Sequence, residues 1–113
     1  MSDASAAPAT AAQPKLPDYI KQTGDGSGSI IITLQWPVTI GGTKVSTVTM
    51  RRSKVRDRLQ SEKAGKTAGE VEINLFAKLC SLGPEEIEDI DLDDYGRLQA
   101  GFSSFLSSRP QPK

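Results

Sequence analysis

Residues 30–50 read IIITLQWPVTIGGTKVSTVTM, and this stretch decides the fold. β-Branched and aromatic residues dominate it, and alternate side chains from Ile30 to Trp36 are expected on one apolar face of a strand. Pro37 cannot donate a ladder hydrogen bond, so it predicts an edge or a bulge. Gly41-Gly42 supplies the positive φ angles of a tight turn. The stretch therefore predicts a β-hairpin, with its return strand over residues 44–52.

Helices are predicted after the hairpin, because a hairpin alone is only marginally stable and its apolar face must be covered. Ser53 is expected to cap a short helix that ends near Lys63. The spacing of Val55 and Leu59 predicts that both side chains of this helix face inward.

A more apolar helix is predicted at the centre of the chain. Thr67 and Glu70 have the spacing of a capping box, and residues 71–82 carry a wide apolar face. Gly83 fits the left-handed position that ends a helix, and Pro84 fits the first turn of the next one. The width of the apolar face indicates that this helix is central to the fold.

The last part of the chain is predicted to hold a short acidic helix and a longer final one. Residues 84–90 form the acidic segment, and Asp91 is expected to cap a helix from Leu92 to about Leu106. The predicted order is a β-hairpin followed by three or four short helices, which is an α+β fold.

The chain divides into three predicted regions. Residues 1–29 are mostly small or polar and cannot bury enough surface to offset their ordering entropy, so we expect a disordered N-terminal arm. Residues 30–106 form the domain, and residues 107–113 form a flexible C-terminal tail. A domain of this size has a marginal core and often gains stability from self-association or from a partner.

The composition favours a protein that is not an enzyme. The 14 basic residues balance the 14 acidic ones, and a neutral chain is poorly suited to nonspecific binding of nucleic acids or anionic membranes. There is no histidine, which excludes His-based triads and proton shuttles. Cys80 is the only cysteine, so a reducing, cytosolic compartment is expected. No apolar run is long enough for a membrane span.

Three motifs that could carry chemistry favour a structural interpretation instead. The glycine-rich residues 24–28 precede a strand rather than a helix, so they are expected to be a linker and not a phosphate loop. The acidic run 89–93 begins like a calcium loop, but Asp94 and Ala100 stand where such a loop needs Gly and Glu. Cys80 lies on an apolar helical face and is expected to be a buried thiol. We therefore predict no cofactor and no metal.

Charge is distributed unevenly along the chain. Residues 44–66 contain eight basic and two acidic residues, whereas residues 70–94 contain nine acidic residues and one basic residue. Such blocks can pair within one molecule or between copies, which predicts a homo-oligomer. The candidate self-association residues are Arg51, Arg52, Arg56, Glu85, Glu86 and Asp89.

A nucleic-acid face over residues 51–58 is an alternative use of the basic block. The two short helices around Gly65 would then form a helix-turn-helix of a small DNA-binding regulator. The neighbouring acidic block opposes this interpretation.

The ordered part of the chain resembles the tail assembly chaperones of contractile-tailed bacteriophages and related prophages. The resemblance spans about residues 30–106. It rests on several stretches in order, namely ITL, PVTIGG and VSTVTMR in the hairpin, INLFAKLC with LGPEEI in the centre, and LDDY, LQ and FL towards the end. The turn Gly41-Gly42-Thr43 departs from a more usual Asp-Gly-Lys type of turn, outside the helical core.

The resemblance implies a role without catalysis. Members of this family bind the long, helical tape-measure protein before the tail tube polymerises around it, and they keep its apolar stretches soluble. They act in the cytoplasm of the bacterial host and are absent from the mature virion. Many are also made as a longer frameshifted form, which would be a further partner. A structural tail or baseplate component is the other open alternative.

Aromatic residues near both ends of the domain fit recognition of an amphipathic helix in a groove. The candidate partner-binding residues are Trp36, Phe102, Phe105 and Leu106. The alternative interpretation, in which the three aromatic side chains simply belong to the core, stays open at this point.

Overall fold

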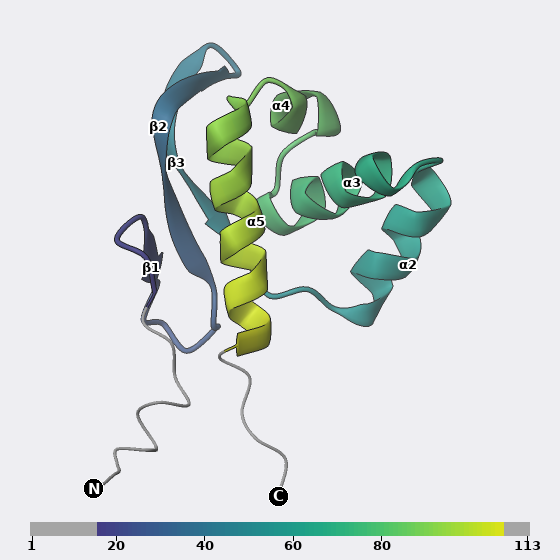
Figure 1. Ribbon diagram of the computed structural model, residues 1–113, viewed down its shortest axis with the longest axis horizontal. Helices are drawn as coiled ribbons and strands as arrows, with labels where there is room; N and C mark the ends of the chain where they lie inside the picture. Colours follow the sequence, from purple (N-terminus) through teal and green to yellow (C-terminus); the bar gives the residue numbers. More distant parts are fainter. Residues whose placement is uncertain (1–15, 108–113) are drawn as a thin grey trace, which may run out of the picture.

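The computed structural model describes residues 16–107. It is a three-stranded antiparallel sheet, in the order β1-β2-β3, followed by helices (Figure 1). This architecture confirms the predicted α+β class. The elements are β1 (Ile20–Gln22), β2 (Ile30–Ile40), β3 (Thr43–Met50), α2 (Val55–Ala64), α3 (Ala68–Cys80), α4 (Pro84–Glu88) and α5 (Leu92–Ser107).

The predicted hairpin is formed by β2 and β3. Gly41 and Gly42 take positive φ angles of 59° and 81° at its turn, as their sequence predicts. The pairing shifts between Thr33 and Val38, so that residues 34–37 of β2 lie opposite a single residue of β3. This is the irregularity that Pro37 predicts.

The irregularity overturns one detail of the predicted strand face. Ile30, Ile32 and Leu34 are buried as expected, but Trp36 is 61% exposed. The alternation of a strand holds only while each residue stays in the ladder. Trp36 lies where β2 leaves the ladder, and its side chain is therefore exposed to solvent.

Part of the expected N-terminal arm is folded. Residues 20–22 form β1, which pairs with residues 30–32, and Ile20 is buried in the core. The connecting loop is held by Asp25, which accepts hydrogen bonds from Thr23 and Ser27. These bonds, that of the Ser27 hydroxyl foremost, lower the pKa of Asp25 to about 2. The glycine-rich segment is thus a turn between two paired strands, and the rest of the arm, residues 1–15, lies outside the described residues, as does 108–113.

Helix α5 lies along the sheet and contacts β2, whereas α3 contacts β3 (Figure 1). The backbone N–H of Arg51, just after β3, donates to the carbonyl oxygen of Leu79 in α3 at 3.0 Å. The side chains that fill the space between sheet and helices are fully buried. The largest of the apolar ones are Phe76, Ile32, Met50, Leu79, Ile87 and Leu98.

The predicted orientation of α2 is wrong. Val55 and Leu59 are 77% and 54% exposed, and the buried side chains of this helix are Asp57 and Ser61. The reason is a network around the Asp57 carboxylate. It accepts two hydrogen bonds from the Arg51 guanidinium, at 2.8 and 2.9 Å, and a third from the backbone N–H of Lys54 at 2.8 Å. Lys54, not Ser53, is therefore the residue at the N-cap.

The ends of α3 follow the prediction at one terminus only. The Thr67 hydroxyl accepts from the backbone N–H of Glu70 at 3.1 Å, as in the predicted cap. The other half of the predicted capping box is displaced by one residue, because the Glu70 carboxylate accepts from the N–H of Lys66 at 2.7 Å and not from that of Thr67. At the other terminus Ser81, with a φ of 58°, takes the left-handed position that we expected at Gly83. Gly83 is extended instead, which suits the residue before a proline.

Candidate binding groove between α2, α3 and α5

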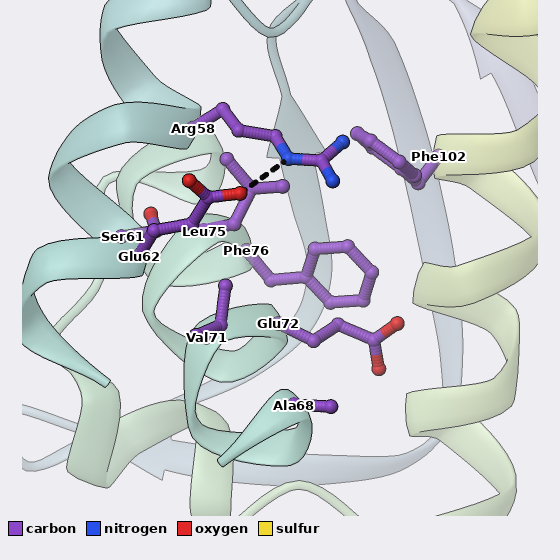
Figure 2. A pocket seen from close by; sticks show the side chains of 9 residues that line it. All are labelled: Arg58, Ser61, Glu62, Ala68, Val71, Glu72, Leu75, Phe76 and Phe102. Carbon is purple, nitrogen blue, oxygen red and sulfur yellow. Dashed lines mark hydrogen bonds and ion pairs between the residues drawn. The ribbon is translucent and has the colours of Figure 1, made fainter. Parts of the chain in front are cut away.

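A groove of about 410 Å³ opens between α2, α3 and α5. Its floor is apolar and comes from α3, with Val71, Leu75 and Phe76, while Phe102 of α5 stands on the opposite side (Figure 2). Charged side chains of both signs line the edge. They are Arg58 and Glu62 of α2 and Glu72 of α3.

Aromatic contacts fix the wall that α5 contributes. The Phe76 ring lies 5.6 Å from both the Tyr95 and the Phe102 rings, measured between centroids. The Tyr95 hydroxyl donates to the Glu72 carboxylate at 2.6 Å, and the Gln99 amide donates to the same oxygen at 2.9 Å. Burial, together with the bond to Glu72, raises the pKa of Tyr95 well above its usual range. The distance between α3 and α5 is thus set by a packed and hydrogen-bonded cluster.

The wall that α2 contributes is fixed through Asp57. The hydrogen bonds from Arg51 lower the pKa of Asp57 well below its usual range, and they raise the pKa of Arg51. On the groove side of the helix, Arg58 and Glu62 form an exposed ion pair at 3.1 Å. An exposed pair of this kind contributes little to stability, so both side chains can exchange partners when something binds.

Cys80 lies outside the groove, and burial raises the pKa of its thiol to about 12, so it is protonated at neutral pH. Residues 16–107 contain no group of three or more His, Cys, Asp or Glu side chains placed to hold a metal ion. What the groove offers is an apolar floor between charged edges.

The structure separates the candidate partner-binding residues. Phe102 lines the groove and is half-buried, whereas Trp36 is exposed on β2. Phe105 is buried against the sheet, with the Arg52 guanidinium 5.2 Å above its ring. Leu106 lies in α5, but its side chain is outside the described part of the chain.

The candidate self-association residues also have different environments. Arg51 is bonded to Asp57, Arg52 stacks on Phe105, and Glu86 accepts from the backbone N–H of Gly83 at 2.8 Å. The other three are exposed, and no ion pair within the described residues engages them. They are Arg56, Glu85 and Asp89.

The role of Asp94 was not among the predictions. Its side chain is fully buried and accepts from the backbone N–H groups of Gln35 and Trp36, both at 2.8 Å. These are the groups that the irregular pairing of β2 withdraws from the ladder. Asp91, in contrast, caps α5 as predicted, by accepting from the N–H of Asp93 at 3.0 Å. The only available signal for Asp94 was Pro37, because a bulge leaves N–H groups that need an acceptor.

The groove itself was also missed, although its floor was visible as the wide apolar face of α3. That face is broader than one packing partner requires, since Leu79 and Phe76 meet the sheet and α5 while Val71 stays half-exposed. When an apolar helix face is wider than its contacts within the molecule require, the excess width indicates a contact with a binding partner.

The helix pair α2 and α3 differs from a DNA-reading helix pair. The second helix of such a motif must be free to enter the major groove. Here α3 is the central packing helix, and Glu70 and Glu72 lie in its first turns.

The described residues thus form a small α+β domain, and none of the helices in residues 16–107 is long and apolar enough to cross a membrane. Over residues 31–107 the sequence matches the family model described as "Phage tail assembly chaperone proteins, E, or 41 or 14". Because the match covers more than half of the sequence, the chain belongs to the phage tail assembly chaperone family, which is not catalytic. The searches of curated proteins and of solved structures found no match.

Proposed function

We propose that this chaperone binds amphipathic helical segments of the tape-measure protein in the groove between α2, α3 and α5. One observation carries the proposal, namely the apolar floor of the groove, which the fold leaves open between two walls that are held firmly in place. A helix that binds there would bury side chains spaced by three and four residues against Val71, Leu75 and Phe102. Its polar residues would meet Arg58, Glu62 and Glu72 at the edges.

The edges suit reversible binding. The Arg58–Glu62 pair and the Glu72 carboxylate offer both signs of charge, so segments with different charge patterns can dock. A chaperone that covers successive apolar stretches of one long protein needs such tolerance, and it must release them when the tube forms. Binding would take place in the cytoplasm of the bacterial host, and the released protein would be absent from the mature virion.

Trp36 offers a second contact away from the groove. It is a large apolar side chain held on a rigid irregularity of β2 by the Asp94 carboxylate. Exposed tryptophans on a fixed backbone are frequent anchors in interfaces. A long partner that leaves the groove, or the longer frameshifted form of this chain, is the proposed occupant.

Ala68→Glu tests the groove without disturbing the core. Ala68 is exposed, lines the groove and begins α3, where an acidic residue is favourable. The matched control is Gly69→Glu, which adds the same charge one residue further along, at a position that does not line the groove. With tape-measure segments titrated into the purified protein, Ala68→Glu and Phe102→Ala are expected to weaken binding by about tenfold or more, and the control by much less.

Equal affinity in Ala68→Glu, Phe102→Ala and wild type would reject the groove as the site. Trp36→Ala is expected to weaken binding of long segments only, with unchanged thermal stability. The alternatives predict different results. A retarded band on duplex DNA would favour the regulator, and recovery of the protein in purified particles would favour a structural tail component.

A further inference from the structure

One charged side chain of the groove has no counter-ion. Glu72 of α3 lines the groove and is half-buried. The other charged residues of the lining, Arg58 and Glu62, pair with each other at 3.1 Å. No ion pair within residues 16–107 engages Glu72. The lining therefore carries one uncompensated negative charge, on the side of the groove where α3 meets α5.

The Glu72 carboxylate is held through one of its two oxygens. Oε1 accepts from the Tyr95 hydroxyl at 2.6 Å and from the Gln99 side-chain amide at 2.9 Å. These two bonds use both lone pairs of Oε1. In the described part of the chain, no hydrogen bond reaches Oε2. Glu72 thus offers its second oxygen, in a fixed position, to a donor from another molecule.

Aromatic rings lie beside this carboxylate. The Phe76 ring lies 5.6 Å from the rings of both Tyr95 and Phe102, and Figure 2 shows the Glu72 side chain next to Phe76, pointing toward α5. The methylene groups of a long cationic side chain can pack on such rings while its charged end reaches a carboxylate. The surroundings of Glu72 therefore suit a cation that arrives on an aliphatic stem.

Binding over the apolar floor changes the environment of Glu72. A helix that covers the floor removes water from the half-buried carboxylate beside it. A carboxylate that loses water without gaining a cation is strongly disfavoured. A segment that lacks a cation at this place incurs this penalty, whereas a segment that supplies one avoids it, so Glu72 discriminates between segments.

We infer that the groove selects helical segments that carry a lysine one turn from their apolar residues, and that the lysine ammonium binds Oε2 of Glu72. The inference rests on the proposed function, because it specifies the segments that the groove accepts. Residues one turn apart share a helix face, so apolar contacts to Val71 and Leu75 and the lysine can come from one segment. Because Oε1 is already occupied, the bidentate bond of an arginine has no advantage here.

The two edges of the groove consequently differ in what they require. At the α2 edge, Arg58 and Glu62 neutralise each other and are exposed, so a bound segment can leave them paired. At the α5 edge, Glu72 is fixed and has no cation of its own. The first edge tolerates many sequences, and the second determines which of them bind tightly.

Two designed peptides test the inference. Both are amphipathic helices with leucines spaced by three and four residues. The Lys peptide has a lysine one turn from the leucines, and the Gln peptide has a glutamine in its place. The full chain is titrated into each labelled peptide, and fluorescence anisotropy at about 50 mM salt measures the affinity. We expect wild type to bind the Lys peptide about tenfold more tightly than the Gln peptide, or better.

Glu72→Gln removes the charge but keeps a side-chain oxygen that can accept from Tyr95 and Gln99. This variant should bind the two peptides with equal affinity. It should bind the Gln peptide at least as tightly as wild type does, which shows that the groove is intact. The matched control is Glu85→Gln, which removes the same charge from an exposed residue of α4 that does not line the groove. The control should keep the preference for the Lys peptide.

Equal affinity of wild type for the two peptides would overturn the inference, as would a preference for the Lys peptide that persists in Glu72→Gln. The proposed function has a separate readout, because Phe102→Ala should weaken both peptides whatever their charge. If Phe102→Ala weakens both but wild type does not discriminate, only the inference fails. If neither peptide binds, or Phe102→Ala binds both like wild type, the groove is not the site and the proposed function fails with the inference.

Discussion

Helices α5 and α2 both carry apolar residues at helical spacing, but α5 buries residues of its apolar face, whereas α2 exposes its own. In α5, Leu98 and Phe105 are buried against the sheet. In α2, Val55 and Leu59 face solvent, and Asp57 occupies the inner side. The difference teaches that a carboxylate with three hydrogen-bond donors fixes the rotation of a helix more firmly than two aliphatic side chains do.

The two helices consequently serve different purposes. Helix α5 supports the fold, and among its described side chains only Phe102 lines the groove. Helix α2 contributes a wall of the groove on one flank and exposes apolar residues on its outer face. A helix whose orientation does not depend on its apolar residues can offer them to partners.

The largest expected contrast comes from trimming one leucine in each helix. Leu98→Ala removes a fully buried side chain and should cost about 2–5 kcal/mol of unfolding free energy, through lost burial and a cavity. Leu59→Ala should change it by less than about 0.5 kcal/mol. Urea titration followed by circular dichroism measures both. Similar losses in the two variants would mean that α2 is a supporting helix too.

Asp57→Asn alters the side chain that orients α2. The amide keeps the shape of the side chain but loses the charge that binds Arg51, so we expect a loss of about 1–3 kcal/mol. The control is Arg58→Gln, which breaks only an exposed ion pair of α2 and should cost about 0–1 kcal/mol. The same urea titration applies. A loss for Asp57→Asn as small as that of the control would show that the network does not orient the helix.

Acid should weaken the same network. The pKa of Asp57 is lowered in the folded protein, first by the hydrogen bonds from Arg51. The unfolded chain therefore takes up this proton first, near its ordinary value of about 4, and stability falls as the pH drops below that point. Stability measured between about pH 5 and pH 2 should fall less steeply for Asp57→Asn than for wild type. Parallel curves would mean that Asp57 titrates alike in both states.

The difference between the helices also marks how far the sequence could predict the structure. Local patterns were sufficient for the glycine turn, for the Thr67 cap and for the α+β class. They failed for α2, because Asp57 is bound by the Arg51 guanidinium, which lies outside the helix. The periodicity of apolar residues carries no information about such a polar contact. They also failed for Asp94, which bonds to backbone groups 58 and 59 residues away.

Local sequence patterns could not predict the groove, for a related reason. Its residues come from three helices, and the sequence placed Phe76 and Phe102 on separate apolar faces without their relative position. β1 was missed because Leu16, Tyr19 and Ile20 are the few large apolar residues of a mostly polar stretch, and Ile20 is buried where β1 pairs with β2, opposite Ile32. The candidate groove thus follows from the packing of elements whose individual formation was predictable.

Substituting two glycines of α5 by alanine gives the smallest contrast, and the two changes in unfolding free energy should have opposite signs. A Cβ atom at Gly96 would have nothing within 4 Å, so Gly96→Ala should stabilise the helix by about 0.5–1 kcal/mol. A Cβ atom at Gly101 would lie 2.7 Å from Ile32 Cδ1 and 2.9 Å from Ile30 Cδ1. Both isoleucines are buried and have little room to move, so Gly101→Ala should lose about 1 kcal/mol net despite its better helix propensity. Thermal unfolding of the two variants measures both signs. Equal gains in stability would mean that α5 is not packed closely against the sheet at Gly101. Close packing would then no longer distinguish α5 from α2 as the supporting helix.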